Sequence, residues 1–206
     1  MPTLLIEGRR FFLCLNRLTI YFIILYMTDI DLKKRKLKMK LYINLACDIL
    51  DIPTPYIHYR IPKDEPNNLG VTYKKRGYYH IYLNAEYPVE AILYNACLHE
   101  CRHVYQSMVC ERKDAYLIEP KEVVDSWIEN FTNYKDVFNV NYELQPVELD
   151  AYAFGDYVFN TMYNQEVIPR KEPLRTPLIK KMKELEMDYP KDLVIDIAKD
   201  YFKMDV

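Results

Sequence analysis

The chain has 206 residues, half of them apolar and 28% charged, with a formal net charge of −2. This length suits a single domain with an ample core, and a net charge so close to zero gives no reason to expect a nucleic-acid partner. The five cysteines are an odd number without paired spacing, which excludes a disulfide scaffold. We therefore expect free thiols and a cytoplasmic protein.

Residues 1–40 form an expected N-terminal extension to a domain that covers residues 41–206. An apolar run at residues 18–27 is too short to span a bilayer, and no small-residue cleavage site follows it. A basic run comes next. Three interpretations stay open: a membrane anchor with its basic side in the cytoplasm, a peripheral helix, or a natural start at Met27 or Met39.

The first part of the domain predicts one helix and three strands. Residues 37–50 have apolar spacing typical of a helix. Residues 56–61 alternate as a strand does, and residues 71–74 and 78–83 are typical of a β-hairpin. His58 lies in the first strand, where packing explains it better than metal binding. With the helices that follow, the pattern predicts an α+β fold with a small antiparallel sheet packed on helices.

A long helix is expected at residues 88–112, where apolar residues recur and no glycine or proline follows Pro88. Within it the sequence H-E-C-R-H places His99 and His103 four residues apart, so both project from one face. Two neutral imidazoles at that spacing can hold one Zn²⁺ at about 2.0–2.1 Å each. Glu100 stands one step round the helix, where it can reach a metal-bound water without being a ligand.

A second helix is expected at residues 146–163, and it carries Glu148 as the candidate third ligand. Gly155 on the same face would let this helix approach the first one closely. The alternative for Glu148 is a solvated carboxylate in the first turn of its helix. Asp150 points roughly the opposite way and is the weaker ligand candidate; a salt bridge to a residue such as Arg102 is its other expected role.

Three further helices are expected around these two. Residues 120–131 form an amphipathic helix whose Trp127 should pack in the core, and residues 132–142 form a polar and aromatic loop that could border a cleft. Residues 178–186 and 190–202 have the alternating charge of solvated helices.

The two motifs together resemble a known family. H-E-C-R-H-V-Y-Q at residues 99–106, followed by P-V-E-L-D-A-Y-A-F at residues 146–154, is similar to a small gluzincin-type zinc metallopeptidase. Compact metallopeptidases of bacteria and their phages, including the ImmA/IrrE-like group, carry such motifs. The resemblance covers roughly residues 70–164.

The resemblance implies a zincin-like fold and a set of site residues. It makes His99, His103 and Glu148 the zinc ligands and Glu100 the general base. The chain departs from the larger gluzincins at one position, because Tyr152 stands four residues after Glu148 where those proteins often keep an aspartate.

The expected reaction is hydrolysis of a peptide bond in a peptide or protein substrate by a zinc-activated water. The resemblance implies that the strand at residues 78–83 receives the substrate as an added strand, which an exposed edge supports through its backbone groups. Tyr142 and Tyr152 are candidates for stabilising the oxyanion. The alternative for each is that its side chain only packs against its neighbours.

Two alternatives stay open at this point. A non-catalytic zincin-like module from a mobile element would keep the fold and the metal but act by binding a partner. A regulatory peptidase that cleaves a repressor is suggested by the ImmA/IrrE-like analogy alone. Intact Glu100 argues against the first, since a purely structural zinc site needs no base.

Overall fold

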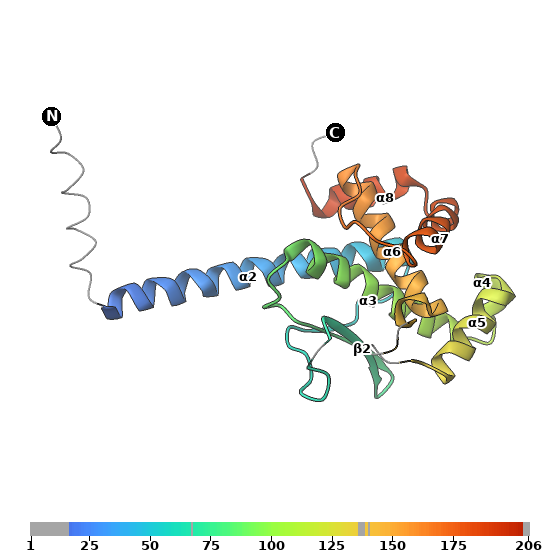
Figure 1. The fold of residues 1–206 in the computed structure, drawn as a ribbon, viewed down its shortest axis with the longest axis horizontal. Helices are drawn as coiled ribbons and strands as arrows, with labels where there is room; N and C mark the ends of the chain where they lie inside the picture. The colour runs from blue at the N-terminus through green and yellow to red at the C-terminus, as the bar shows by residue number, and fades with distance from the viewer. Residues whose placement is uncertain (1–16, 67, 136–138, 140, 204–206) are drawn as a thin grey trace. The chain divides into compact units, whose positions relative to one another are not determined.

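The computed structural model of the chain describes residues 17–66, 68–135, 139 and 141–203, and it describes side chains from residue 31 onward (Figure 1). The first sixteen residues of the expected extension lie outside this range. The chain divides into two units, residues 1–37 and 38–206. Among the described residues, no helix combines the length and the apolar character that a bilayer crossing requires.

Helix α2 (Arg17–Leu50) begins in the first unit and ends in the second. It starts well before residue 37, because the apolar run and the basic run contain no glycine or proline to interrupt it. Its second half belongs to the core of residues 38–206, where Met39, Tyr42 and Ile43 are fully buried. The helix predicted at residues 37–50 is therefore the last part of a longer one.

The sheet has three strands in the order β1-β3-β2, with β1 at Tyr56–His58, β2 at Gly70–Lys75 and β3 at Tyr78–Leu83. Strands β2 and β3 form the predicted antiparallel hairpin, and the residues of its turn, Arg76 and Gly77, both have positive φ.

The expectation of a purely antiparallel sheet is wrong for β1, which pairs parallel to β3. Alternating side chains reveal a strand but not its partner or its direction, so the sequence could not distinguish the two arrangements. The strand is also shorter than residues 56–61, because the chain leaves the sheet after His58.

Helices α3 (Glu90–Cys110) and α6 (Pro146–Tyr163) pack against each other, and the sheet covers α3 on one side (Figure 1). Ile81 and Leu83 of β3 are fully buried in this core. Gly155 lies where the two helices approach, because a Cβ there would stand 3.2 Å from the Asn95 side chain. The close approach expected from this small residue is confirmed.

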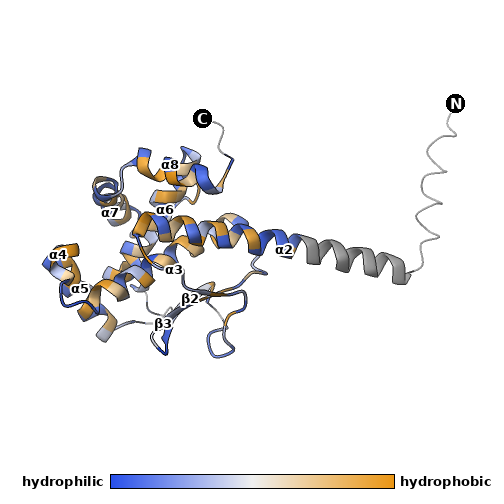
Figure 2. Cartoon of the chain, turned by 180° about the vertical axis from the view of Figure 1, so that it is seen from behind, coloured by the Kyte–Doolittle hydropathy of each residue, from blue (hydrophilic) through white to orange (hydrophobic). Residues whose placement is uncertain are grey.

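The remaining elements surround this pair: α4 (Ala115–Ile118), α5 (Lys121–Thr132), the 3₁₀ turn η1 (Tyr142–Leu144), α7 (Arg175–Asp188) and α8 (Lys191–Tyr201). Trp127 of α5 is buried as predicted, and α7 and α8 both pack on α6. Figure 2 shows hydrophobic and hydrophilic residues alternating along these helices, as amphipathic elements require. The predicted α+β class is confirmed.

Candidate metal centre

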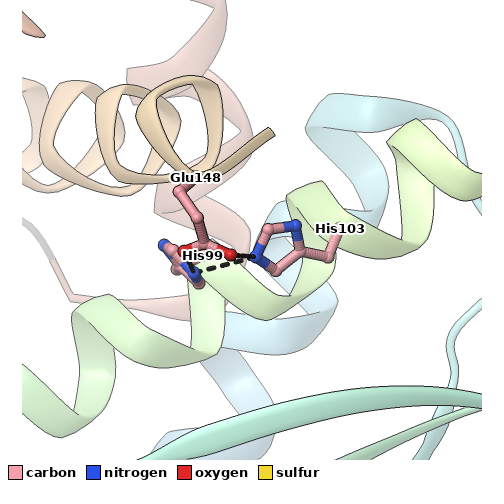
Figure 3. A group of neighbouring side chains, drawn as sticks. All are labelled: His99, His103 and Glu148. Atoms are coloured by element: carbon pink, nitrogen blue, oxygen red, sulfur yellow. Dashed lines mark hydrogen bonds and ion pairs between the residues drawn. The ribbon is translucent and has the colours of Figure 1, made fainter. Parts of the chain in front are cut away.

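Helix α3 presents His99 and His103 from one face, one turn apart (Figure 3). Their Nε2 atoms are 3.0 Å apart, and their rings are nearly perpendicular, at 88°. Val104 and Leu98 of the same helix are fully buried on its other sides, which fixes the orientation of the face that carries the histidines. The spacing of four residues therefore brings two imidazole nitrogens to one point, as the sequence predicts.

Glu148 reaches the same point from the first turn of α6 (Figure 3). Its Oε2 lies 3.4 Å from His99 Nε2, and its Oε1 lies 3.3 Å from His103 Nε2. Ligands about 2.0–2.1 Å from a tetrahedral ion stand about 3.3 Å from one another, so the spacing of these donors matches such an ion. The three residues predicted as ligands form a buried group able to hold a metal ion.

The carboxylate of Glu148 is fully buried, and its Oε2 has no hydrogen-bond partner among the described residues. A buried carboxylate oxygen left in this state is costly unless a cation or a proton faces it. The unpaired oxygen stands on the side of His99, where the two imidazole nitrogens also converge. This observation, together with the donor set, fits a bound cation.

The electrostatics of the group support the same interpretation. Burial alone would raise the pKa of Glu148, but the facing His103 and His99 side chains hold it well below its usual range. Burial lowers the pKa of His103, but the charge and hydrogen bond of Glu148 outweigh this effect and raise it to about 9. Without a metal, the group therefore keeps an ionised carboxylate beside a protonated imidazole.

Gln106 fixes the tautomer of His103. Its Nε2 donates to the Val147 carbonyl at 3.0 Å and to Asp150 Oδ2 at 2.7 Å, so its Oε1 must be the atom that faces His103 Nδ1 at 2.8 Å. Because Oε1 can only accept, Nδ1 carries the hydrogen and Nε2 presents a lone pair when the imidazole is neutral. The Nε2 atom of neutral His103 can therefore coordinate a metal.

Asp150 lies behind Gln106 and is not part of the ligand group. Arg102 donates to it twice, from Nε at 2.7 Å and from Nη2 at 3.3 Å, and both side chains are almost fully buried. The salt bridge that the sequence suggested for Asp150 is thus present. The guanidinium is enclosed by four aromatic rings, those of Tyr105, Trp127, Phe154 and Tyr189.

Glu100 lies beside the group, pointing toward strand β2. Thr72 donates from Oγ1 to Glu100 Oε2 at 2.7 Å, and a Cβ added to Gly70 would stand only 2.6 Å from Glu100 Oε1. The strand backbone therefore approaches the carboxylate at a distance that only glycine allows. The sequence placed Glu100 next to the metal site but did not predict these two partners.

Tyr134 is a further site residue that the sequence did not predict. Its hydroxyl donates to Glu148 Oε1 and accepts from the Tyr142 hydroxyl, the latter at 3.1 Å. This bond uses one lone pair of Oε1, whereas Oε2 has no hydrogen-bond partner among the described residues. In a chain with 20 tyrosines, no local pattern distinguishes this one. Tyr152, by contrast, packs on the ring of His99, with centroids 4.5 Å apart.

A cleft runs over the group and consists of two hollows that meet at His99 and Glu100. The Arg170-side hollow, about 470 Å³, is bordered by Ile92, Asn95, Glu143, Tyr152, Ile168 and Arg170. The His103-side hollow, about 480 Å³, is bordered by Val71, Tyr73, His103, Ser107, Phe131 and Tyr134. Tyr142 borders both.

The strand beside the cleft is β2, not β3. Tyr78–Leu83 is the central strand of the sheet, with β1 on one side and β2 on the other. Its backbone groups are therefore already paired, and the expectation that it receives a substrate is wrong. Gly70 and Val71 of β2 border the cleft, which makes this edge strand the available one.

Comparison of the chain with known protein families, with curated proteins and with solved structures found no match. The function is therefore inferred from the geometry of the site itself.

Proposed function

We propose that the protein is a zinc-dependent metallopeptidase with a zincin-like fold, in which His99, His103 and Glu148 hold Zn²⁺ and Glu100 is the general base. One observation carries the proposal: two imidazoles and a buried carboxylate with an unpaired oxygen converge, and a second carboxylate, that of Glu100, stands beside them in an open cleft. Two histidines and a glutamate are the ligand set of catalytic zinc in peptidases, which leaves one position open.

Zinc held by this group would lower the pKa of a bound water toward about 7 and polarise the carbonyl of the scissile bond. Glu100 then takes the proton of the attacking water and delivers it to the leaving amine. Thr72 supports this role by donating to Glu100 Oε2 at 2.7 Å, which fixes the orientation of the carboxylate.

The substrate is a peptide or protein whose backbone adds to β2. This strand pairs with β3 along one edge only, and its first residues border the cleft. An extended peptide that pairs with the other edge would pass over Glu100 and the metal group. The donor to the oxyanion is Tyr142, which borders both hollows, whereas Tyr134 donates to Glu148 and Tyr152 packs on His99.

The cytoplasm is the compartment that we propose. Four cysteines lie in the described part of the chain, and all four are free thiols: Cys47, Cys97, Cys101 and Cys110. Disulfides do not form stably in a reducing compartment, where such thiols persist.

The decisive experiment replaces Glu100 with Gln. Since Glu100 is not a ligand, we expect Glu100→Gln to retain one zinc per chain, measured by elemental analysis of the purified protein. Cleavage of a peptide library should fall by about 10²–10⁴, the usual effect of losing a general base. The ligand variant Glu148→Ala is the control, and it should lose the zinc as well.

Two outcomes would contradict the proposal. If the parent and Glu100→Gln cleave peptides at the same rate, Glu100 is not the general base. A parent that holds zinc and cuts nothing, while both proteins capture the same partner equally well, would favour the non-catalytic binding module.

A further inference from the structure

The two halves of the cleft differ in their chemistry. The walls of the His103-side hollow carry the aliphatic side chain of Val71 and four aromatic rings, those of Tyr73, Phe131, Tyr134 and Tyr142. Phe131 is 37% exposed and Tyr134 47% exposed. Large apolar surfaces that remain exposed inside a cleft mark a place where a ligand covers them.

The hydroxyls of Tyr134 and Tyr73 in this hollow are already hydrogen-bonded to neighbouring carboxylates. The Tyr134 hydroxyl donates to Glu148, and the Tyr73 hydroxyl donates to Glu65 Oε1 at 3.2 Å. Glu65 Oε2 in turn accepts from Asn68 Nδ2 at 2.8 Å. The hydroxyls are thus bound at the edge of the hollow, and the rings present mainly apolar surface to its interior.

The Arg170-side hollow is polar by comparison. Arg170 donates from Nε and Nη2 to Asp156, at 2.8 Å and 2.9 Å, and Asn95 donates to the same carboxylate at 3.0 Å. Glu143 adds a further charge to this wall. A large apolar side chain placed here would displace water from charged and polar groups without replacing their hydrogen bonds, which is unfavourable.

We propose that the His103-side hollow is the specificity pocket of the enzyme, and that it selects peptides with a large aliphatic or aromatic side chain next to the scissile bond. This inference rests on the proposed peptidase function. A peptide paired with β2 points successive side chains to opposite sides. The residue adjoining the cut bond can therefore fill the hollow, whose volume of about 480 Å³ is within the range of ligand pockets.

The position of Phe131 allows a matched test. It lies near the end of α5, three residues after Ile128, and the two side chains are similarly exposed, at 37% and 42%. Phe131 borders the hollow, whereas Ile128 does not. The variants Phe131→Asp and Ile128→Asp therefore place the same charge on the same helix, inside the pocket in one protein and outside it in the other.

The first measurement is the cleavage profile of the zinc-loaded proteins on a peptide library with one varied position at a time. We expect the parent to prefer Leu, Met, Phe or Tyr over Ala by at least about 10-fold at one position beside the cut. Phe131→Asp should lose this preference and favour Lys or Arg there, while Ile128→Asp should keep the parent's profile. A parent that shows no side-chain preference, or the same change of preference in both variants, would contradict the proposed specificity pocket.

The second measurement does not depend on catalysis. Zinc-loaded protein is titrated with leucine hydroxamate and with glycine hydroxamate, which bind the metal through the same group and differ in the side chain. The leucine compound should bind at least about 10-fold more tightly to the parent and to Ile128→Asp, and the difference should vanish in Phe131→Asp. Equal affinity for the two compounds in the parent would contradict the inference.

The two measurements also separate this inference from the proposed function. Cleavage without a side-chain preference would support the peptidase function and contradict the specificity pocket. Tighter binding of leucine hydroxamate than of glycine hydroxamate, in a protein that cuts no peptide, would support the pocket and contradict the peptidase function.

Discussion

At the scale of single residues, the proposed base, Glu100, faces strand β2 at a glycine, Gly70. Gly70 allows the β2 backbone to pass beside Glu100, and a methyl group there would come within 2.6 Å of Oε1 and 2.8 Å of Cγ. These distances are far shorter than any ordinary contact, so either the strand or the Glu100 carboxylate must move. Gly70 therefore determines where the Glu100 carboxylate can lie, although it has no functional group itself.

We expect Gly70→Ala to retain zinc and to lose most of the peptide cleavage, because it displaces the base but none of the ligands. Gly77→Ala is the control, since its Cβ would meet nothing within 4 Å. That substitution strains a residue at φ +84° and should lower the stability alone, by about 1 kcal/mol. Loss of zinc in Gly70→Ala, or cleavage equal to that of the parent, would show that this contact does not position the base.

The protonation of His103 gives opposite pH trends with and without metal. Its pKa is about 9 in the metal-free fold, above its ordinary value of about 6.5. The raised pKa stabilises the metal-free protein fully below about pH 6.5, and this contribution disappears as the pH rises through about 9. Zinc must displace the same proton, so zinc affinity rises with pH over that window.

We therefore expect the melting temperature of the metal-free protein to fall between pH 6.5 and 9. Over the same range, the zinc association constant should rise by up to about tenfold per pH unit, with one proton released per zinc bound. Titration calorimetry in buffers of different ionisation enthalpy counts this proton directly. A zinc affinity that stays constant between pH 6.5 and 8 would contradict the protonated state assigned to His103.

At the scale of elements, α3 and α6 are joined by a buried ion pair that also orients a ligand. Arg102 of α3 and Asp150 of α6 are each nearly inaccessible, and Asp150 additionally holds the Gln106 amide that faces His103. Losing one partner of a buried pair leaves an uncompensated charge, which typically costs about 3–5 kcal/mol. Helix packing and metal binding are therefore linked through one carboxylate.

A double substitution separates the two roles. Asp150→Leu should lower the free energy of unfolding by about 3–5 kcal/mol in chemical denaturation. Arg102→Met/Asp150→Leu should recover much of it, because the fully buried guanidinium is no longer left without its carboxylate. Both proteins lose the acceptor that orients Gln106, so both should bind zinc about 10–100-fold more weakly than the parent. A double variant with restored stability and unchanged zinc affinity would show that the carboxylate has no positioning role.

The same elements show what the sequence could and could not reveal. The helical spacing of His99 and His103 was enough to predict that the two side chains share a face, because that depends on the period of one helix. Glu148 was predicted as a third ligand from its motif, and its position beside the histidines depends on how α6 packs on α3. Tyr134 and Thr72 depend on how a loop and a strand fold back over α3, which no local pattern encodes. The parallel pairing of β1 has the same cause, since a strand's partner is decided by tertiary packing.

At the scale of the whole molecule, every residue assigned to the site lies in the unit of residues 38–206. The buried part of α2 in that unit begins at Met39, so a chain that starts at Lys38 keeps all of the helix surface that packs in the core. The apolar and basic runs precede this point. The metal centre should therefore form without residues 1–37.

We expect the protein that lacks residues 1–37 to bind one zinc per chain with the affinity of the full-length protein. The proposed ligands come from two helices, α3 and α6, which meet only in the folded chain. Zinc bound to this group would therefore stabilise the folded state by mass action, by about 2.7 kcal/mol when free zinc is 100 times the dissociation constant. The melting temperature of the truncated protein should rise on addition of zinc as much as that of the full chain, and fall again with a chelator. A truncated protein that folds, judged by circular dichroism, but shows no zinc-dependent rise would mean that the first unit contributes to the metal centre. Its His99→Ala form is the control, since removing one imidazole should abolish the rise in either length of chain.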